Sequence, residues 1–488
     1  MKHKLLVQPL GVGIDANHGG NLLQILKDAG FAPDAPCGGS GKCGKCRLTV
    51  NGQEELACRF TVNDDLVVTL PPKEDARVLT DSSPISLAAD PVQPGYLIAF
   101  DIGTTTVVCF LLSPDGREMA VESMLNPQRA WGADVISRIE KALAGEQELL
   151  THRIREGMQD LICKCCLHAG ISPEEVGVVS VVGNPCMQQL FMGISPKNLG
   201  AVPFAPVLTS AQILPAGEYL PLCRGASLLV VPDVSGYVGA DTMGCILASQ
   251  MYRSSETILM VDIGTNGEMV LSHGGRMAAC SAAAGPALEG ANIRFGMRGS
   301  SGAIDHVRVE RGELHCTVIG GGEARGICGS GVIDAVAAAL ELKLMNRRGR
   351  ILAPEEWEGE RFIPLTPEVF LTQGDIRQVQ MAKGAIAAGI LLMCTHLGIA
   401  PEEIDQVVLA GAFGSYLNPE NACKIGLLPK VLSGKIQTAG NLAGAGAKML
   451  ALNRSQLLLT QALVQRIEFI ELAQIPSFSK TFAQQMAF

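Results

Sequence analysis

Short hydrophobic stretches bounded by turn residues dominate the first 70 residues of the chain. The stretches "HKLLVQPLG" (residues 3–11), "CRLTVNG" (46–52) and "DLVVTLP" (65–71) predict strands. The stretch "NLLQILKDAG" (21–30) predicts a helix that ends at Gly30. We therefore expect a small unit in which a mixed sheet packs on one helix.

The pattern is lost between residues 71 and 95, where no clear periodicity remains. This stretch contains Pro71, Pro72, Pro84, Pro91 and Pro94. Because proline fixes φ, we expect a linker that is stiff in places. The predicted organisation is an N-terminal domain of residues 1–72, a linker of residues 73–95 and a large domain of residues 96–488.

From residue 96 onward, strands of the buried type run into glycine loops and alternate with helical stretches. The expected strands include "YLIAFDIGTTT" (96–106), "VVSVVGNP" (178–185), "LLVVPDVSG" (228–236), "TILMVDIGTNGE" (257–268) and "VVLAGAFGS" (407–415). The expected helices include "DVISRIEKALAG" (134–145) and "GVIDAVAAALELKLM" (331–345). This alternation predicts an α/β fold with largely buried sheets.

Composition narrows the class of protein. The chain has 488 residues, 47% of them apolar and 18% charged, which is enough for more than one large core. The net charge of −9, without any run of Lys or Arg, argues against a nucleic-acid surface. The N-terminus lacks the apolar core of a signal peptide, and the longest apolar stretch (384–400) falls short of a spanning helix. We expect a cytoplasmic protein that has no membrane partner.

Four cysteines near the N-terminus have the spacing C-x5-C-x2-C-x11-C; they are Cys37, Cys43, Cys46 and Cys58. The first three lie in the glycine-rich run "PCGGSGKCGKC" (36–46), which favours an irregular loop over a helix or strand. Four thiolates on one tight loop and a later segment are typical of a 2Fe–2S centre. Together with the predicted sheet and helix, they indicate a ferredoxin-like β-grasp domain that carries electrons.

Zinc is the main alternative ligand for these cysteines. Structural zinc sites usually contain two C-x2-C pairs, and here only Cys43 and Cys46 form one. The other cysteines are scattered through mostly apolar segments, so we interpret them as small buried residues. Only Cys328, in the loop "GICGSG" (326–331), is retained as a functional candidate.

A repeated turn carries the second signature. The motif "DIGTTT" (101–106) recurs as "DIGTNG" (262–267), each time between an apolar strand and a second β-rich segment. Such a turn offers N–H groups and hydroxyls to phosphate oxygens, and its aspartate can hold Mg²⁺, usually through water. The two copies, followed by "GAFGS" (411–415), predict a two-lobed actin-like (ASKHA) ATPase domain that clamps ATP. No P-loop pattern is present.

The residues predicted to bind the nucleotide come from these turns and from two glycine loops. They are Gly103, Thr104, Thr105, Thr106, Gly264, Thr265, Asn266, Gly267, Gly329, Ser330, Gly411, Ala412, Phe413 and Gly414. Asp101 and Asp262 are predicted to hold Mg²⁺.

The combination of the cysteine domain and the actin-like domain resembles the reductive activators of corrinoid proteins. The resemblance covers nearly the whole chain and includes "VVGNPCMQQLF", "VPDVSGYVGADT", "AAGPALEGANI", "GICGSGVIDAV", "TQGDIRQVQMAKGAI", "LAGAFGSYLN" and "IEFIELAQIPSFSKTF". One departure is that some members carry an extra domain between the two parts, where this chain has only the linker.

The resemblance implies ATP-dependent one-electron reduction of a Co(II) corrinoid to Co(I) on the corrinoid protein of a methyltransferase system. It also implies a low-potential donor such as a ferredoxin or flavodoxin, and it leaves a homodimer open. In this scheme Glu268 or Asp241 orients the attacking water. As a further hypothesis, the small residues of segment 281–290 face the corrinoid.

Three other functions stay open at this stage. An activator of a radical dehydratase also couples an actin-like ATPase to an iron–sulfur electron, but its cysteines are expected inside the ATPase domain. A redox-sensing switch would bind ATP without turnover. A small-molecule kinase with an attached ferredoxin would transfer phosphate to a sugar or acid.

Overall fold

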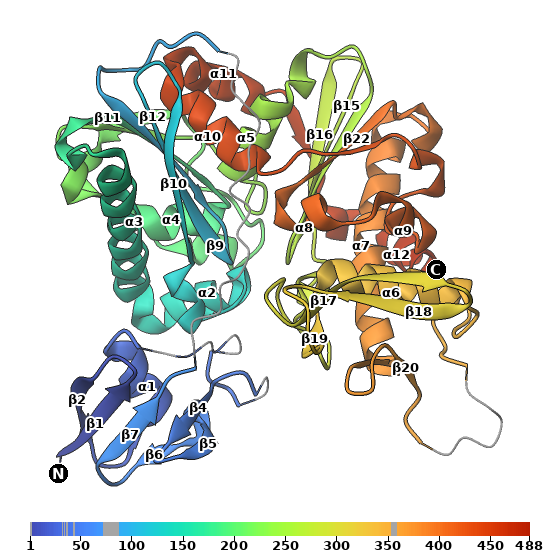
Figure 1. Ribbon diagram of the computed structural model, residues 1–488. Coiled ribbons are helices and arrows are strands. Elements are labelled where there is room, and N and C mark those ends of the chain that lie inside the picture. Colours follow the sequence, from blue (N-terminus) through green and yellow to red (C-terminus); the bar gives the residue numbers. More distant parts are fainter. Residues whose placement is uncertain are drawn as a thin grey trace.

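The computed structural model describes residues 2–31, 33, 35, 38–41, 44–71, 87–352 and 359–488. These residues form a small N-terminal unit and two larger lobes, each built around a six-stranded sheet (Figure 1). The predicted α/β class and the two lobes are therefore confirmed.

The N-terminal unit is a mixed five-stranded sheet packed on one helix, as predicted. Its strands, in spatial order, are β2 (Val12–Asn17), β1 (Lys2–Gln8), β7 (Leu66–Thr69), β4 (Arg47–Val50) and β5 (Gln53–Leu56), and only the β1–β7 pair is parallel. Strands β3 (Gly20–Asn21) and β6 (Thr61–Val62) form a second short pair. Helix α1 (Leu22–Asp28) begins at the N-cap Asn21, whose side chain accepts a hydrogen bond from the N–H of Gln24, and buries Leu22 and Leu26.

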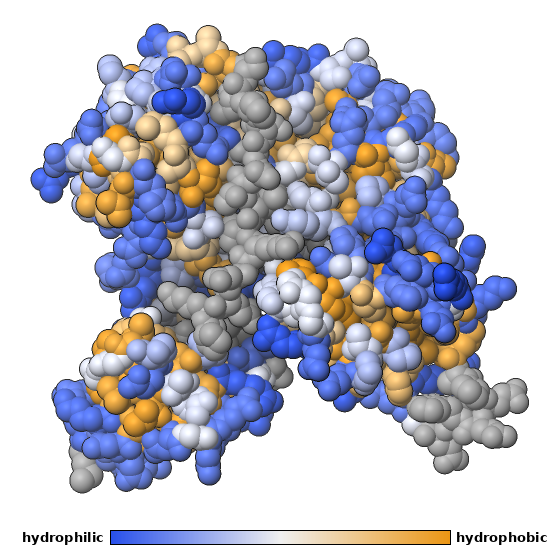
Figure 2. Space-filling model, in the orientation of Figure 1, coloured by the Kyte–Doolittle hydropathy of each residue, from blue (hydrophilic) through white to orange (hydrophobic). Residues whose placement is uncertain are grey.

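The outer face of this small sheet remains partly apolar. Leu10 and Val67 are 58% and 43% exposed, and hydrophobic side chains gather on the surface of the unit in Figure 2.

The first lobe contains the sheet that follows the linker. Its strands, in spatial order, are β10 (Glu118–Leu125), β9 (Thr106–Leu112), β8 (Tyr96–Ile102), β11 (Val176–Gly183), β13 (Ser227–Val230) and β12 (Gln212–Pro215). Strand β11 is parallel to both β8 and β13, so the carboxyl ends of these three strands meet at one edge. The helices of the lobe are α2 (Val135–Lys141), α3 (Gln147–Ala169), α4 (Pro185–Met192) and α5 (Ala240–Ser249).

The second lobe repeats this plan. Its sheet has the order β23 (Ile436–Thr438), β22 (Gln406–Ala410), β14 (Ile258–Ile263), β15 (Gly267–His273), β16 (Arg276–Ala282) and β24 (Ile467–Phe469). Smaller sheets contain β17 (Ala303–Glu310), β18 (Glu313–Val318) and β19 (Gly326–Ile327), and β20 (Phe362–Pro364) with β21 (Phe370–Thr372). Its helices are α6 (Gly329–Glu341), α7 (Gln373–Leu397), α8 (Gly411–Tyr416), α9 (Pro419–Lys424) and α12 (Phe478–Gln485). The same C-terminal part of the chain supplies α10 (Leu442–Leu452), which packs on β8 and β11 of the first lobe, and α11 (Arg454–Val464), which packs on α10 and α5.

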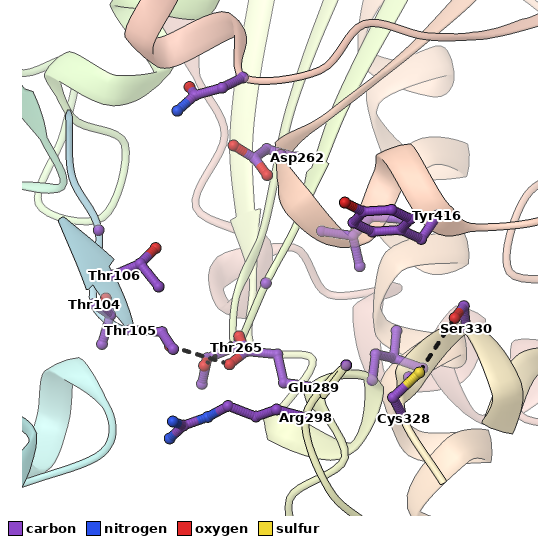
Figure 3. A pocket seen from close by; sticks show the side chains of 18 of the residues that line it. Thr104, Thr105, Thr106, Asp262, Thr265, Glu289, Arg298, Cys328, Ser330 and Tyr416 are labelled. Carbon is purple, nitrogen blue, oxygen red and sulfur yellow. Dashed lines mark hydrogen bonds between the residues drawn. The ribbon is translucent and has the colours of Figure 1, made fainter. Parts of the chain in front are cut away.

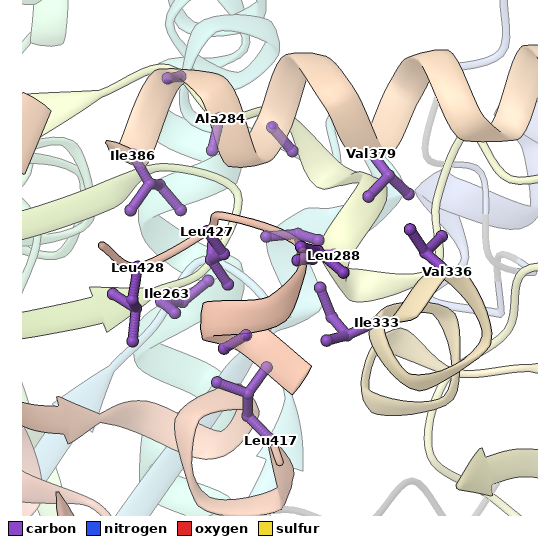
Figure 4. Close-up of a cluster of buried hydrophobic side chains, with 14 of the residues drawn as sticks. Ile263, Ala284, Leu288, Ile333, Val336, Val379, Ile386, Leu417, Leu427 and Leu428 are labelled. Atoms are coloured by element: carbon purple, nitrogen blue, oxygen red, sulfur yellow. The ribbon is translucent and has the colours of Figure 1, made fainter. Parts of the chain in front are cut away.

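Helix α7 is the central helix of the second lobe's hydrophobic core. It packs with α6 and the β14 turn around Ile263, Leu288, Ile333 and Ile386 (Figure 4). Among the described residues it is the one helix long and apolar enough to cross a membrane, and 78% of its most apolar window is buried inside the protein. The helix is longer than the apolar stretch 384–400 considered in the sequence, because it begins at Gln373, well before that stretch.

Helices α5 and α10 lie between the two sheets and join the lobes through one core. The helices cross closely because both carry glycine at the contact: a Cβ atom added to Gly446 would collide with the backbone of Gly244. The hydroxyl of Ser180 in β11 donates to the carbonyl of Ala447 at 2.6 Å. A helix from the C-terminal part of the chain thus supports the sheet of the first lobe.

The end of the predicted linker is bound to the ATPase part. The Asp90 N–H donates to the Leu452 carbonyl and the Arg454 N–H donates to the Asp90 carbonyl, both at 2.9 Å. Leu87 and Val92 pack against the core between the sheets. Residues 73–86 of the linker lie outside the described residues.

Candidate functional site

A cavity of about 330 Å³ lies between the two lobes and is lined by both repeated turns. Residues Asp101, Gly103, Thr104, Thr105, Thr106, Asp241, Asp262, Gly264, Thr265, Asn266, Glu268, Gly329, Ser330 and Gly411 all line it. The two turns, more than 150 residues apart in the sequence, therefore face one another (Figure 3).

The first turn joins the antiparallel strands β8 and β9 and is held from behind by side chains of the first lobe. Asn126 donates through Nδ2 to the carbonyl of Gly103 at 2.8 Å. The guanidinium of Arg138, which is fully buried, donates to the carbonyl of Thr104. These two hydrogen bonds hold the carbonyls of Gly103 and Thr104 on the side of the turn that faces the first lobe. The threonines of the turn line the cavity on its other side.

The second turn joins β14 and β15, in which Asp262 and Glu268 are cross-strand partners. It is closed by a hydrogen bond from the Gly264 N–H to the Asn266 carbonyl at 2.9 Å. Gly267 does not line the cavity; it lies against α7, where an added Cβ atom would approach Ile386 to 2.9 Å.

Four carboxyl groups, Asp101, Asp241, Asp262 and Glu268, gather at this end of the cavity. Burial raises the pKa of Asp101 and Asp262 to about 7 and that of Asp241 to about 6, and repulsion from Asp241 contributes to both of the former. Burial likewise raises the pKa of Glu268. Four crowded carboxylates without a neutralising cation are unfavourable, so the donor set suits a hard divalent ion.

No three acidic, His or Cys side chains of the described residues lie close enough together to bind a metal ion directly. The Asp101 carboxylate instead accepts a hydrogen bond from Nδ2 of Asn441 at 2.9 Å. That the aspartates reach an ion through water stays a prediction.

The "GAFGS" segment differs from the expected loop, because it forms the short helix α8. Gly411, at φ 78°, makes room for the second-turn aspartate: a Cβ atom there would collide with Oδ1 of Asp262. Gly414 does not line the cavity and packs against Leu409 of β22. Ala412 and Phe413 lie in α8, and their side chains are outside the described part.

The "GICGSG" segment lines the cavity at the start of α6. Gly329 and Ser330 form the first helical residues, and the Ser330 hydroxyl donates to the Asp305 carbonyl at 2.9 Å. Cys328 lies at the N-cap, with Sγ 3.4 Å from the Ser330 hydroxyl. The side-chain Oδ1 of Asp305 is buried at the cavity and accepts no hydrogen bond from the described residues, which leaves it available to a ligand.

Several residues of the cavity were not predicted from the sequence. Asn184 donates from Nδ2 to the Thr104 hydroxyl at 3.0 Å. Its position directly after β11, the parallel neighbour of β8, is a signal that could have identified it. Arg298 is the one Arg or Lys of the described residues that lines the cavity. Neither Arg298 nor Glu289, which contacts both turns, lies in a recognisable motif.

Segment 281–290 faces inward, contrary to the hypothesis that it faces a corrinoid. Only Ala283 is exposed, while Ala284 and Leu288 belong to the core of the second lobe (Figure 4). Leu288 and Glu289 line the cavity between the lobes. The small residues of this segment thus serve packing around the second turn.

The cysteine loop is described in part. Cys46 is buried and Cys58 is half-buried, whereas Cys37 and Cys43 lie outside the described residues. The carbonyl of Cys46 accepts a hydrogen bond from the N–H of Ala57 at 2.9 Å, which brings the segments of Cys46 and Cys58 together. A Cβ atom at Gly39 (φ 98°) would lie 4.0 Å from Cβ of Cys58, so the glycine loop passes beside that cysteine.

The N-terminal unit contacts both lobes. Arg153 of α3 donates to the Asp28 carbonyl at 3.2 Å, and Lys27 lies 5.9 Å above the ring of Trp131. On the other side, Nζ of Lys45, a residue between Cys43 and Cys46, donates to the Gly296 carbonyl of the second lobe at 3.1 Å. The cysteine loop therefore lies where the two lobes approach each other.

Comparisons with family models cover the chain beyond the linker. Residues 96–254 match the model described as the RACo middle region, and residues 256–488 match the model described as the C-terminal domain of RACo, the ASKHA domain.

Two curated proteins are similar over most of the chain. The corrinoid activation enzyme RamQ of Eubacterium limosum is 30% identical over 578 aligned positions, which cover 97% of each chain. The [Co(II) methylated amine-specific corrinoid protein] reductase of Methanosarcina barkeri is 29% identical and covers 74% of this chain and 71% of its own. The RamQ alignment is longer than the 488 residues of this chain, so that relative has segments that are missing here.

A solved structure extends the likeness to three dimensions. The protein described as a reductive activator for corrinoid, iron–sulfur protein superposes with a TM-score of 0.74 at 26% identity. The superposition covers 100% of this chain and 98% of that structure, and so includes the N-terminal unit.

Proposed function

The chain belongs to the RACo family of reductive activators of corrinoid proteins, and from this premise we propose that it uses ATP to drive an electron from an iron–sulfur centre to the Co(II) corrinoid of a partner protein. The observation that carries the proposal is the cavity between the lobes, where the two Asp-Ile-Gly-Thr turns face each other and which lies near the cysteine domain. The names of both curated relatives support a corrinoid protein as the partner and give no support to a dehydratase.

In the ATP site, we assign the phosphates to the hydroxyls of Thr104, Thr105, Thr106 and Thr265, to Asn266 and to the first turn of α6 with Gly329 and Ser330. Backbone N–H groups at a helix start and in tight turns suit anions. We assign Mg²⁺ to Asp101 and Asp262, through water, because both carboxyl groups are buried at the cavity beside Asp241, and a divalent cation would offset the cost of burying their charges and of the repulsion between them. Asp241 and Glu268 remain the candidates for orienting the attacking water.

In the N-terminal domain, we assign a 2Fe–2S cluster to Cys37, Cys43, Cys46 and Cys58. The positive φ of Gly38, Gly39, Gly41 and Gly44 supports a loop that wraps around a bound group. The cluster would supply the one-electron step. The contacts of Lys45 with the second lobe and of Arg153 with the N-terminal unit hold the domain that would carry it against the two lobes. We retain the domain limits 1–72, 73–95 and 96–488, with residues 87–95 attached to the ATPase part.

The remaining assignments follow from this function. The donor is a low-potential protein such as a ferredoxin or flavodoxin, the location is the cytoplasm, and a homodimer is the assembly to test first. The burial of α7 within the second lobe supports the assignment without a membrane.

The test of the cluster is the iron content of protein purified without oxygen. We expect about two irons per chain, and Cys46→Ser should lower the iron content and the visible absorption. Cys163→Ser is the matched control, because Cys163 is exposed on α3. Stoichiometric zinc in place of iron would overturn the assignment.

The test of the function is ATP hydrolysis with and without a Co(II) corrinoid protein. We expect the corrinoid protein to stimulate hydrolysis, and Asp262→Ala to abolish it while the visible spectrum of the cluster is kept. Unstimulated hydrolysis with every corrinoid protein tried, or phosphate transfer to a sugar or acid, would contradict the proposal.

A further inference from the structure

Glu289 is the residue that joins the two phosphate turns directly. Its Oε1 accepts a hydrogen bond from the Thr265 hydroxyl at 2.8 Å, and its Oε2 accepts one from the Thr105 hydroxyl at 3.2 Å (Figure 3). Thr105 belongs to the first lobe and Thr265 to the second. One carboxylate thus spans the gap between the lobes at the point where we assign the phosphates of ATP.

The position of Glu289 is fixed by its backbone. It ends a short 3₁₀ turn (Pro286–Glu289) whose Ala287 and Leu288 are buried in the second lobe. The next residue, Gly290, has φ 78°, and a Cβ atom there would approach the Met297 N–H nitrogen to 3.1 Å. The carboxylate is therefore presented to the turns by a rigid segment.

The carboxylate and a phosphate would compete for the same donors. Each threonine hydroxyl has one proton to donate, so Thr105 and Thr265 cannot donate to Glu289 and to a phosphate oxygen at the same time. A phosphate placed next to this carboxylate would also be repelled by it, in a cavity that is already lined by five other carboxyl residues, Asp101, Asp241, Asp262, Glu268 and Asp305. Arg298 is the one guanidinium lining the cavity in the described part of the chain, and it lies beside Glu289 (Figure 3).

We propose that Glu289 and a phosphate of the nucleotide compete for the same two threonine hydroxyls, so that the incoming phosphate takes over these hydroxyls and thereby releases the direct link between the lobes. Glu289 is then a positioning residue that sets nucleotide affinity and couples it to lobe movement. The inference rests on the proposed function in assuming that this cavity binds ATP.

The test compares Glu289→Gln with the parent chain in binding of MgADP and a non-hydrolysable MgATP analogue, measured by calorimetry. The amide keeps the size of the side chain but removes its charge, so we expect about tenfold tighter binding, with the larger gain for the triphosphate. The steady-state KM for MgATP should fall by a similar factor while kcat stays within about threefold. Glu289→Ala should also bind more tightly, and Glu256→Gln, exposed at the foot of β14, should equal the parent.

Each other outcome overturns the inference. If Glu289→Gln binds nucleotide as the parent does and loses kcat, Glu289 acts on the attacking water instead. If both variants bind nucleotide more weakly, the hydrogen bonds of Glu289 with Thr105 and Thr265 serve to stabilise the site. If the parent itself binds no adenine nucleotide, the proposed function fails together with this inference, whereas an unchanged affinity in a parent that binds ATP defeats this inference alone.

Discussion

At the scale of single residues, the unusual feature of the site is that several buried carboxyl groups, among them Asp101 and Asp262, line one cavity. A folded-state pKa of about 7 for Asp101 and Asp262, against 3.8 for an ordinary aspartate, means that the folded protein retains protons that the unfolded chain has released. Between about pH 4 and pH 7 the folded state therefore binds more protons than the unfolded state, and its stability falls as the pH rises.

This gives a testable pH dependence. In EDTA, the free energy of unfolding should fall between about pH 4 and pH 7, by on the order of 1.4 kcal/mol for each unit of pKa elevation and less where solvent in the cavity screens the charges. Asp101→Asn should flatten this dependence, and Mg²⁺ should raise stability more at pH 8 than at pH 5.5. Denaturant titrations measure all three. Stability that rises with pH in EDTA would contradict the picture of repelling carboxylates.

At the scale of elements, the strap of residues 87–95 is part of the ATPase fold and not a free linker. Asp90 is bound on both sides to the junction of α10 and α11, and Leu87 and Val92 pack on the interlobe core. We expect a truncated protein of residues 87–488 to be more stable than one of residues 96–488 by roughly 2–3 kcal/mol, since backbone hydrogen bonds contribute about 1 kcal/mol each. Thermal unfolding should show a Tm about 5 °C higher for the longer protein.

The control for this comparison is Asp90→Ala in the longer protein, which removes the exposed Asp90–Arg454 ion pair but leaves the backbone bonds. It should cost well under 1 kcal/mol. Equal Tm values for the two truncated proteins would show that the strap contributes nothing to the fold.

Elements whose determinants are local could be predicted from the sequence, and elements set by distant packing could not. Both Asp-Ile-Gly-Thr turns are hairpins because their glycines and hydroxyls act within a few residues, and both were placed correctly. The glycine-rich α8 was expected as a loop, since nothing in its composition favours a helix. The crossing of α10 with α5 depends on Gly446 meeting Gly244, some 200 residues away, which no local pattern reveals.

The candidate site divides in the same way. Asp101, Asp262 and the threonines lie at or after the ends of apolar strands and were visible as motifs, whereas Asn441, Arg298 and Glu289 reach the cavity from segments without a motif. These three residues reach the cavity only because tertiary contacts bring their segments to it, and no local sequence pattern records such contacts.

At the scale of the whole molecule, a short chain of contacts connects the cysteine domain with the cavity between the lobes. Lys45 contacts Gly296, which forms a β-bridge with Ile327, and the neighbouring Arg298 and Cys328 line the cavity. The same domain is held to the first lobe through Arg153. Movement of the lobes on ATP binding would therefore change the contacts of the cluster domain on both sides.

We expect Lys45→Ala to weaken this coupling. The variant should keep its iron and its affinity for MgATP, because the side chain lies outside the cavity, but the stimulation of corrinoid reduction by ATP should fall about threefold to tenfold. Arg47→Ala is the matched control, because Arg47 is exposed and pairs only with Glu54 of its own unit in the described contacts. A variant that couples ATP to reduction like the parent would show that the path through Gly296 is not used.

The central claim is that ATP makes an otherwise unfavourable electron transfer possible. Its most direct test is the absorption of a Co(II) corrinoid protein mixed without oxygen with the full chain and a low-potential reductant, in the presence and absence of MgATP. We predict conversion to Co(I) with MgATP and little or none without it, and no conversion when Cys46→Ser replaces the parent. Full and rapid reduction without nucleotide would contradict the claim.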